Sequence, residues 1–438
     1  MAPNKMIALA AAVVAVVTAG VVGAGIALRQ HGGADTAGTD PAPGTYASAP
    51  RWAWSYKLAD SNPSLLFTTD NRALISTKMS DGKATSEHII AVDLVYGRTS
   101  WEQQLPSGAQ CGTGPRYKPD STMVVCVDIT SGRLIILDAE DGTTLGTPYV
   151  GQSNPNVVVS GNTIYSCTAD QGVLNFQSGT ATDLSENFSV HIADGERGNC
   201  GFMVEGSYAV VSGSGNKTTA IVDSQGTITY QSFDSSAQFF GEDLLTSYVY
   251  DDKTREFPTF ATIIDVNGDK KYNRLFSGAT VFTLPGRRSA DVYIEKNGTV
   301  RHRVTGDALW KYSNPDDMSV VGAVGDVLVM FEDATTLRGY DITTGRVLWS
   351  VPVTALYKGG KPPAGVNLEN EFSGMGLIWR FAGDGETLVV STGNLLTGIN
   401  AQTGDITWEN GANGFVFAQQ SNYLLLRNGE HITAMKFE

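Results

Sequence analysis

One short pattern recurs along this chain and constrains its fold more than any other feature. An apolar run ends in Asp or Asn, a Gly follows three or four residues later, and several copies add a Trp, as in "AVDLVYGRTSW", "YDITTGRVLW" and "INAQTGDITW". The copies align on Asp93 and Gly97, Asp138 and Gly142, Asn175 and Gly179, Asp223 and Gly226, Asp265 and Gly268, Gly306 and Trp310, Asp341 and Gly345, and Asn400 and Gly404. Successive copies lie 37 to 59 residues apart. A repeat of this length indicates one supersecondary unit that buries its faces against neighbouring units.

The chemistry of the repeat is that of a β-hairpin. Asp and Asn side chains cap tight turns, and Gly adopts the positive φ that such turns require. From Arg51 onward the chain consists of short apolar runs such as "ALISTKM" and "HIIAVDL", separated by Gly, Asp and Asn, without a sustained helical period. Four short strands in each unit predict an all-β fold, a β-propeller. About nine units can be counted, which exceeds the usual number, so we expect eight blades within a range of seven to nine, with the unit around Asn175 incomplete.

The two ends of this region complement one another. The segment "RWAWSYKL", residues 51–58, looks like the outer strand of a repeat, whereas "FVFAQQSNYLLLRNGEHITAMKF" looks like three strands without an outer one. A ring of blades must be closed to remove its open strand edges. We therefore expect a propeller over residues 51–438 in which residues 51–58 complete the last blade.

The residues before Arg51 divide into three segments. Residues 6–28, "MIALAAAVVAVVTAGVVGAGIAL", contain no charged group and are long enough to cross a bilayer as a helix. A retained transmembrane anchor is favoured over a cleaved signal peptide, although Val22 and Ala24 could form a cleavage site. Residues 1–5 would be a short cytoplasmic tail, because Lys5 favours that side. Residues 29–50, rich in Gly, Ala and Pro, are expected to form a disordered linker to an extracytoplasmic domain at the cell membrane.

The four cysteines fit this location. Cys111, Cys126, Cys167 and Cys200 lack the spacings of zinc and c-type haem sites. In an exported protein they predict two disulfides, with sequential pairing of Cys111 with Cys126 and Cys167 with Cys200. Four buried thiols are the alternative.

The formal charge of -14 makes nucleic-acid binding improbable, because an acidic surface repels phosphate backbones.

The motifs "YDITTGRVLW", "AVDLVYGRTSW" and "INAQTGDITW" resemble the tryptophan-docking repeat of the PQQ-like β-propeller superfamily. The resemblance extends over nearly all of the chain after Arg51. It implies that the docking tryptophans are structural rings that pack between adjacent blades: Trp54, Trp101, Trp310, Trp349 and Trp408. The superfamily contains quinoprotein alcohol dehydrogenases and also cofactor-free propellers of the BamB-like branch.

No catalytic apparatus emerges from the motifs. Quinoprotein dehydrogenases carry two adjacent cysteines and a Ca²⁺ site, and this chain has no adjacent cysteines. "DVNGDKKY" places Asp265, Asn267 and Asp269 like calcium ligands, but Lys270 stands where a calcium loop needs Gly, so a turn is the better interpretation. The templates of metalloproteases, serine hydrolases and P-loop proteins are absent. We therefore predict no cofactor, no metal and no catalytic residue.

Two long connections are candidates for partner contact, because binding residues concentrate on such loops. They span residues 357–374 and 250–259, and the first offers Tyr357, Lys358, Lys361 and Asn367. A plain surface loop is the alternative.

A basic cluster forms a second candidate surface. Arg287, Arg288, Arg301, His302 and Arg303 fall within one repeat, and their guanidinium groups could hold an anionic envelope ligand. In a strand, Arg301 and Arg303 would share one face and His302 the other. A solvated blade face is the simpler interpretation.

The sequence thus favours a non-catalytic protein-binding or scaffold module of the cell envelope, whose partner is another envelope protein or an envelope ligand. A quinone- or Ca²⁺-dependent oxidoreductase and an extracellular small-ligand sensor are the alternatives.

Overall fold

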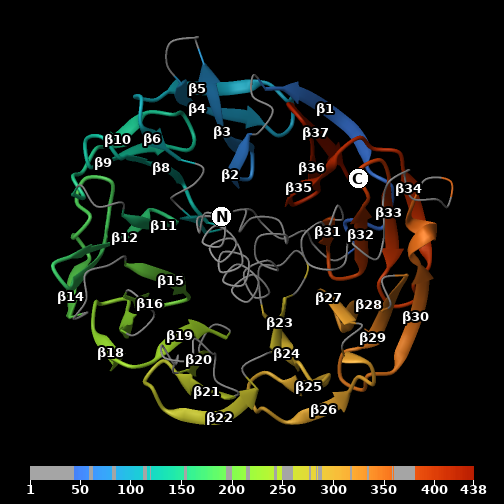
Figure 1. Cartoon of the computed structure of the whole chain (residues 1–438). Coiled ribbons are helices and arrows are strands. Elements are labelled where there is room, and N and C mark those ends of the chain that lie inside the picture. The colour runs from blue at the N-terminus through green and yellow to red at the C-terminus, as the bar shows by residue number, and fades with distance from the viewer. Residues whose placement is uncertain are drawn as a thin grey trace, which may run out of the picture.

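The computed structural model describes residues 44–58, 63–80, 85–111, 116–118, 120–151, 155–193, 200–213, 218–240, 244–248, 260–275, 278–282, 284, 289–315, 318–332, 335–357, 359 and 380–438. Nine separate antiparallel sheets, numbered here as blades 1 to 9 in chain order, are formed by these residues. They stand around a ring, each with its first strand toward the centre and its last toward the periphery (Figure 1). The chain is a nine-bladed β-propeller.

Blades 1 to 3 are built as follows. Blade 1 holds β2 (Ser64–Thr68), β3 (Arg72–Ser80), β4 (Thr85–Asp93) and β5 (Thr99–Gln104); blade 2 holds β6 (Ala109–Gln110), β8 (Met123–Asp128), β9 (Arg133–Asp138) and β10 (Thr144–Gly146). Blade 3 has five strands: β7 (Arg116–Tyr117), β11 (Asn156–Ser160), β12 (Thr163–Asp170), β13 (Val173–Gly179) and β14 (Phe188–Ala193).

The middle of the chain forms blades 4 to 6. Blade 4 contains β15 (Gly201–Glu205), β16 (Tyr208–Ser212), β17 (Thr219–Asp223) and β18 (Ile228–Ser232), and blade 5 contains β19 (Ser236–Phe239), β20 (Leu244–Tyr248), β21 (Phe260–Asp265) and β22 (Lys270–Leu275). Blade 6 contains β23 (Gly278–Phe282), β24 (Ser289–Glu295), β25 (Thr299–His302) and β26 (Ala308–Lys311).

Blades 7 to 9 complete the ring. Blade 7 has β27 (Met318–Val324), β28 (Val327–Glu332), β29 (Thr336–Asp341) and β30 (Val347–Pro352), followed by the short 3-10 helix η3 (Val353–Leu356). Blade 8 has β31 (Arg380–Gly383), β32 (Thr387–Ser391), β33 (Leu396–Asn400) and β34 (Ile406–Asn410). Blade 9 combines β35 (Phe415–Gln420), β36 (Tyr423–Asn428) and β37 (His431–Lys436) with β1 (Arg51–Lys57) from the other end of the chain.

The repeated motif forms the turn between the third and fourth strands and the seam to the preceding blade. In seven of the seams that the structure describes, an aromatic ring from the fourth strand of one blade lies against the turn glycine of the next. These pairs are Trp54 and Gly97, Trp101 and Gly142, Phe188 and Gly226, Tyr230 and Gly268, Tyr272 and Gly306, Trp310 and Gly345, and Trp349 and Gly404. Phe or Tyr thus occupies the docking position in blades 3 to 5.

Each docking tryptophan also has a fixed polar contact. The indole N–H groups of Trp54, Trp101, Trp310 and Trp349 donate to the carbonyls of Leu94, Ala139, Ile342 and Ala401 at distances of 2.7, 3.2, 3.0 and 2.6 Å. In every case the acceptor directly follows the Asp or Asn of the next turn. A buried indole that lacked an acceptor would lose this hydrogen bond, so the pairing fixes both the depth and the rotation of each blade.

A β-bulge sets the direction in which these aromatic side chains point. In eight of the described outer strands the ladder register shifts one residue before the docking position, as between Ala91 and Val92 opposite β5. A bulge bends the strand and changes the face to which the following side chain points. Blade 3 lacks this shift between β13 and β14.

The expectation that the Asn175 unit is incomplete was wrong. Asn175 lies within β13, where its side chain bonds the His191 Nδ1 at 2.6 Å, and the following turn is longer, between Gly179 and Phe188. The alignment on Asn175 therefore placed a turn inside a strand. The unit is a full blade and holds a fifth strand, so nine blades replace the expected eight.

Closure by the N-terminus was confirmed, and it extends further than expected. β1 pairs with β37 from Arg51 opposite Lys436 to Lys57 opposite His431. Residues 44–50, expected to be disordered linker, pack on the ring: the side chain of Tyr46 is fully buried, and its ring stacks on Phe437 at 4.1 Å. The linker expectation was therefore wrong for these residues.

Tyr46 replaces the turn that the last seam lacks. Because β37 and β1 are not joined by a hairpin, blade 9 offers no turn carbonyl to Trp408, whose indole N–H donates instead to the Tyr46 carbonyl at 2.8 Å. The Tyr46 amide donates to the Asp384 carboxylate at 2.6 Å. Tyr46, which precedes the first strand in the chain, thus joins blade 8 to blade 9.

An excursion with one strand, β7, contacts several blades near the centre of the ring. After β6 the chain leaves blade 2, and β7 adds in parallel to β11 of blade 3. Tyr117 is buried, stacks on Phe67 of blade 1 at 4.8 Å and donates its hydroxyl to the Val125 carbonyl at 2.7 Å. Lys118 reaches Glu205 of blade 4 at 2.9 Å.

The predicted disulfides were confirmed. Cys111 bonds Cys126 and anchors the start of this excursion to β8, while Cys167 of β12 bonds Cys200 just before β15. The second disulfide therefore ties blade 3 to blade 4.

Among the described residues, no helix is long and apolar enough to cross a membrane. Residues 6–28, for which the sequence predicts an anchor, lie outside the described residues.

We expect Gly97→Ala to destabilise the propeller by about 2–4 kcal/mol, because an added Cβ would lie 2.4 Å from the Trp54 ring and because φ is +66°. Gly206→Ala is the matched control: its φ is +53°, but no atom lies within 4 Å of the added Cβ. It should cost about 1 kcal/mol from backbone strain alone. Denaturant midpoints followed by tryptophan fluorescence give both values, and equal losses would show that the ring contact does not matter.

We expect Tyr46→Ala to cost about 3–5 kcal/mol, because it removes a buried ring that stacks on Phe437. Tyr46→Phe should cost about 1 kcal/mol or less, since the bond from the hydroxyl to the Ser421 carbonyl is long, at 3.4 Å. Denaturant unfolding of the full chain distinguishes the two. A Tyr46→Ala variant as stable as Tyr46→Phe would mean that residues 44–50 do not stabilise the last seam.

Replacing Cys167 and Cys200 together by Ser should lower stability by about 2–4 kcal/mol, because the unfolded chain loses a closed loop between residues 33 apart. Reductant added to the wild-type protein during thermal unfolding should cause at least this loss, because it opens the Cys111–Cys126 bond as well. A variant with all four cysteines replaced serves as the control, and its transition should not respond to reductant. A reductant-insensitive wild type would contradict both disulfides.

Candidate functional site

The predicted contact residues separate once the chain is folded. Tyr357 is buried in the apolar core shared by blades 7 and 8, with 4% of its surface exposed, so its side chain is not available to a partner. Lys358, Lys361, Asn367, Arg287 and Arg288 lie outside the described residues. The long loop therefore remains a predicted contact surface, but Tyr357 is no longer among its candidate residues.

The described part of the basic cluster is engaged in the fold. Arg301 pairs with Glu295 at 3.1 Å, and Arg303 donates to the carbonyls of Ala290 and Phe240 at 3.1 and 3.3 Å. β25 ends at His302, which occupies the turn position of Asp in other blades and accepts the Gly306 amide through its carbonyl. Arg303 therefore lies outside the strand, so the expectation that Arg301 and Arg303 share one strand face was wrong.

The calcium-like motif is a turn. The Asp265 carboxylate accepts the amides of Asn267 and Asp269 at 2.9 and 3.0 Å and pairs with Lys271 at 2.7 Å. These bonds together hold the pKa of Asp265 below its ordinary value, against the opposing effect of desolvation. Within the described ranges, no three His, Cys, Asp or Glu side chains gather as metal ligands.

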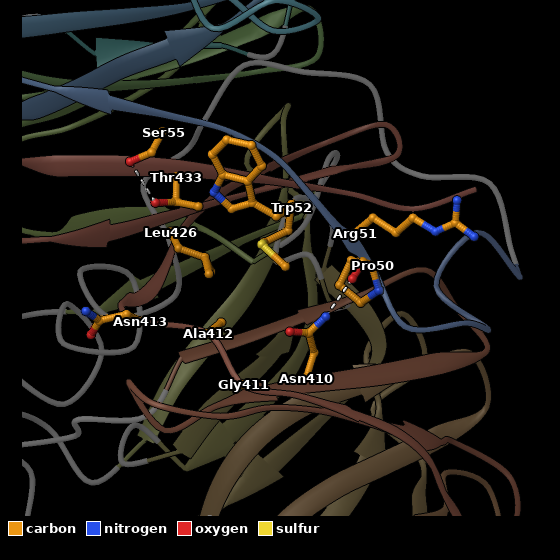
Figure 2. A pocket seen from close by; sticks show the side chains of 11 residues that line it. Pro50, Arg51, Trp52, Ser55, Asn410, Gly411, Ala412, Asn413, Leu426 and Thr433 are labelled. Atoms are coloured by element: carbon orange, nitrogen blue, oxygen red, sulfur yellow. Dashed lines mark hydrogen bonds between the residues drawn. The ribbon is translucent and has the colours of Figure 1, made fainter.

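An open groove lies at the seam where the ring is closed, between blades 8 and 9 (Figure 2). We call it the seam groove, and its volume is about 480 Å³. It is lined by Pro50, Arg51, Trp52, Ser55, Asn410, Gly411, Ala412, Asn413, Leu426, Thr433 and Met435.

Trp52 is the dominant side chain of the seam groove. It stands two residues before the docking Trp54, and the bulge between them turns the two rings to opposite sides of blade 9: Trp54 packs toward blade 1 and Trp52 lies over the groove. The ring of Trp52 is 65% exposed. An exposed Trp beside buried Leu426 and Met435 provides a large apolar surface with a free indole edge.

Polar groups line the remainder of the groove. Asn410 donates through Nδ2 to the Pro50 carbonyl at 2.6 Å, and the Thr433 hydroxyl donates to Ser55 Oγ at 3.3 Å (Figure 2). Arg51, the single charged residue among the lining, pairs with Glu438 at 2.6 Å at the exposed rim. The lining contains no carboxylate, imidazole or thiol, so the groove is suited to binding through apolar and amide contacts.

Sequence reasoning missed this groove, although a signal was present. Trp52 was treated only as part of a closing strand. In other blades the same position carries Thr99, Ala308, Val347 or Ile406, so a Trp at this position is unusual within the repeat. Asn410 and Asn413 gave no signal, because their place beside Trp52 depends on ring closure.

One known protein family matches part of the repeated region. Residues 335–435, from blade 7 to blade 9, match the sequence profile of a family described as outer membrane protein assembly factor BamB. The match supports the resemblance of the repeat in these blades to that of the PQQ-like β-propellers. No curated protein sequence matches the chain.

Solved structures show PQQ-like and other propellers as neighbours. BamB from Moraxella catarrhalis is 12% identical with a TM-score of 0.43, over 89% of this chain and 98% of that one. The quinohemoprotein alcohol dehydrogenase ADHIIG from Pseudomonas putida HK5 is 11% identical with a TM-score of 0.46, over 94% and 81% of the two chains. Sqt1 from Saccharomyces cerevisiae is 11% identical with a TM-score of 0.42, over 89% and 99%. At these values the three structures carry no argument about what this PQQ-like propeller binds.

Proposed function

We propose that this PQQ-like propeller is a non-catalytic, membrane-anchored binding module that holds another protein of the cell envelope through the seam groove. The anchor is residues 6–28, an uncharged apolar segment long enough to span a bilayer. The propeller would lie on the extracytoplasmic side, where two disulfides are stable.

The observation that carries the proposal is the exposed ring of Trp52 above an apolar floor. Tryptophan contributes more than most residues to protein interfaces, because a rigid ring buries much surface at a small entropy cost. Leu426 and Met435 form the floor, so a partner side chain inserted beside Trp52 would be surrounded by apolar atoms. The groove is therefore constructed like the centre of an interface.

The polar lining indicates what kind of partner fits. Asn410 and Asn413 offer amide groups at the edge of the groove, and amides can pair with the backbone of an extended polypeptide. Arg51 at the rim is held in an exposed ion pair with Glu438, which a carboxylate of the partner could replace. A segment with one large apolar side chain, exposed backbone and a nearby carboxylate would complement all three features.

The match to the BamB profile supports a role without chemistry, since that description names an assembly factor. The cysteine pairing is consistent with this role. All four cysteines are used in disulfides between residues 15 and 33 apart, which differ from the adjacent-cysteine bond expected of a quinoprotein dehydrogenase.

Trp52→Ala should weaken partner binding by about thirtyfold, because it removes the ring that covers the apolar floor. Full-length tagged protein is purified in detergent from the membranes of its own host, the proteins that co-purify are quantified by mass spectrometry, and the affinity of the purified partner is then measured. Val347→Ala is the matched control, since Val347 stands at the same outer-strand position of blade 7 and is 45% exposed. Thermal unfolding should be unchanged in both variants.

The partner should be retained by Val347→Ala and lost from Trp52→Ala. If both variants retain the same proteins, the seam groove is not the binding site. Native mass spectrometry of the same material with added PQQ and Ca²⁺ tests the non-catalytic role, and stoichiometric binding of the quinone would overturn it.

A further inference from the structure

A second hollow lies near the inner strands of blades 4 and 5 and is independent of the seam groove. We call it the inner cleft, and its volume is about 170 Å³. It is lined by Arg116, Phe202, Met203, Val210, Ser212, Ser236, Ala237, Gln238 and Tyr248. One wall is apolar, from Phe202, Val210 and Ala237, and the remainder carries hydrogen-bonding groups.

The polar groups of the inner cleft suit an anion. Tyr248 is 6% exposed, and its hydroxyl accepts a hydrogen bond from Gln238 Nε2 at 3.3 Å. Burial raises the pKa of Tyr248, so the phenol stays neutral and able to donate at physiological pH. Ser212 and Ser236 add hydroxyls. The lining contains no carboxylate, and Arg116 is its one charged residue.

Arg116 does not come from either blade that forms the cleft. It stands on β7, the strand that leaves blade 2 and joins blade 3, and its Nη2 donates to the Phe202 carbonyl of blade 4 at 3.3 Å.

The segment that carries Arg116 is held on both sides. Before it, Cys111 is bonded to Cys126, and its amide donates to the buried Glu87 carboxylate at 2.9 Å. After it, Tyr117 is buried against Phe67, and Lys118 pairs with Glu205 at 2.9 Å. These contacts fix the chain around Arg116, and the bond from its Nη2 to the Phe202 carbonyl directs the exposed guanidinium to the cleft, which limits the entropy cost of binding.

We propose that the inner cleft binds a small organic carboxylate. The planar guanidinium of Arg116 matches a carboxylate with two parallel hydrogen bonds, and the Tyr248 phenol and Gln238 amide lie on the same cleft. The volume of 170 Å³ holds roughly six water-sized groups, which limits the ligand to a short chain. The apolar wall takes the alkyl part of that chain.

The experiment uses propionate as the probe and the full chain in detergent micelles, with binding measured by calorimetry. Propionamide has nearly the same shape without the charge, and inorganic phosphate is an anion of different geometry. We expect saturable propionate binding with a Kd on the order of 1 mM, as a ligand of this size permits. Propionamide and phosphate should bind at least about tenfold more weakly.

Arg116→Gln should weaken propionate binding by about tenfold or more, because it removes the charge-assisted pair. Arg98→Gln is the matched control: it makes the same substitution at an exposed arginine of blade 1 that does not line the cleft, so binding should change by less than about twofold. Tyr248→Phe keeps Arg116 and β7 intact and should weaken binding by about fivefold through loss of one hydroxyl. This variant tests the cleft even if Arg116→Gln disturbs β7.

Three results would overturn the proposal. The first is the absence of saturable propionate binding to the wild-type chain. The second is binding that Arg116→Gln and Tyr248→Phe leave unchanged. The third is phosphate or propionamide binding as tightly as propionate, which would exclude carboxylate recognition.

Discussion

The contact between an aromatic side chain and the turn glycine of the next blade is the interaction on which the closed propeller depends. A four-stranded blade has two apolar faces and no core of its own, so it is stable only between neighbours. Apolar clusters accordingly join adjacent blades: Trp54, Ile75 and Ile90 pack with Leu425 and Ile432 across the seam between blades 9 and 1. In four seams an indole bond to the following turn also helps to set the distance and angle between the two blades.

Two sectors depart from this rule, and each has its own substitute. Blade 2 carries Gly146 at the docking position, and an added Cβ there would lie 2.1 Å from the Ala181 carbonyl, so backbone packs directly on backbone. The neighbouring blades compensate with β7, the Cys167–Cys200 disulfide and the Lys118–Glu205 pair. The last seam compensates with Tyr46. Both departures exchange a repeated local contact for contacts between residues far apart in the chain.

This distinction explains what could be predicted from the sequence. The turns at Asp93, Asp341 and Asn400, the closing strand 51–58 and the sequential disulfides follow from local pattern or from the symmetry of the repeat. Blade 3 was underestimated, because Phe188 replaces Trp and because a longer turn moves the alignment away from Asn175. The buried Tyr46 and the fifth strand at Arg116 could not be predicted, since each depends on contacts between residues far apart in the chain. Trp52 gave a signal by its place in the repeat, but the groove beside it depends on ring closure.

The seam groove lies in one of the two sectors that depart from the repeat, and the inner cleft of blades 4 and 5 takes Arg116 from β7, the strand that compensates for the other departure. Where a ring docks on a turn glycine, the seam is filled, and any added side chain disturbs two blades at once, as the 2.4 Å contact at Gly97 illustrates. At the closing seam and beside β7, the fold is held by disulfides, buried rings and chain ends. Side chains at these two places do not have to fit a docking contact. Trp52 and Arg116 can therefore serve ligand binding while the propeller remains closed.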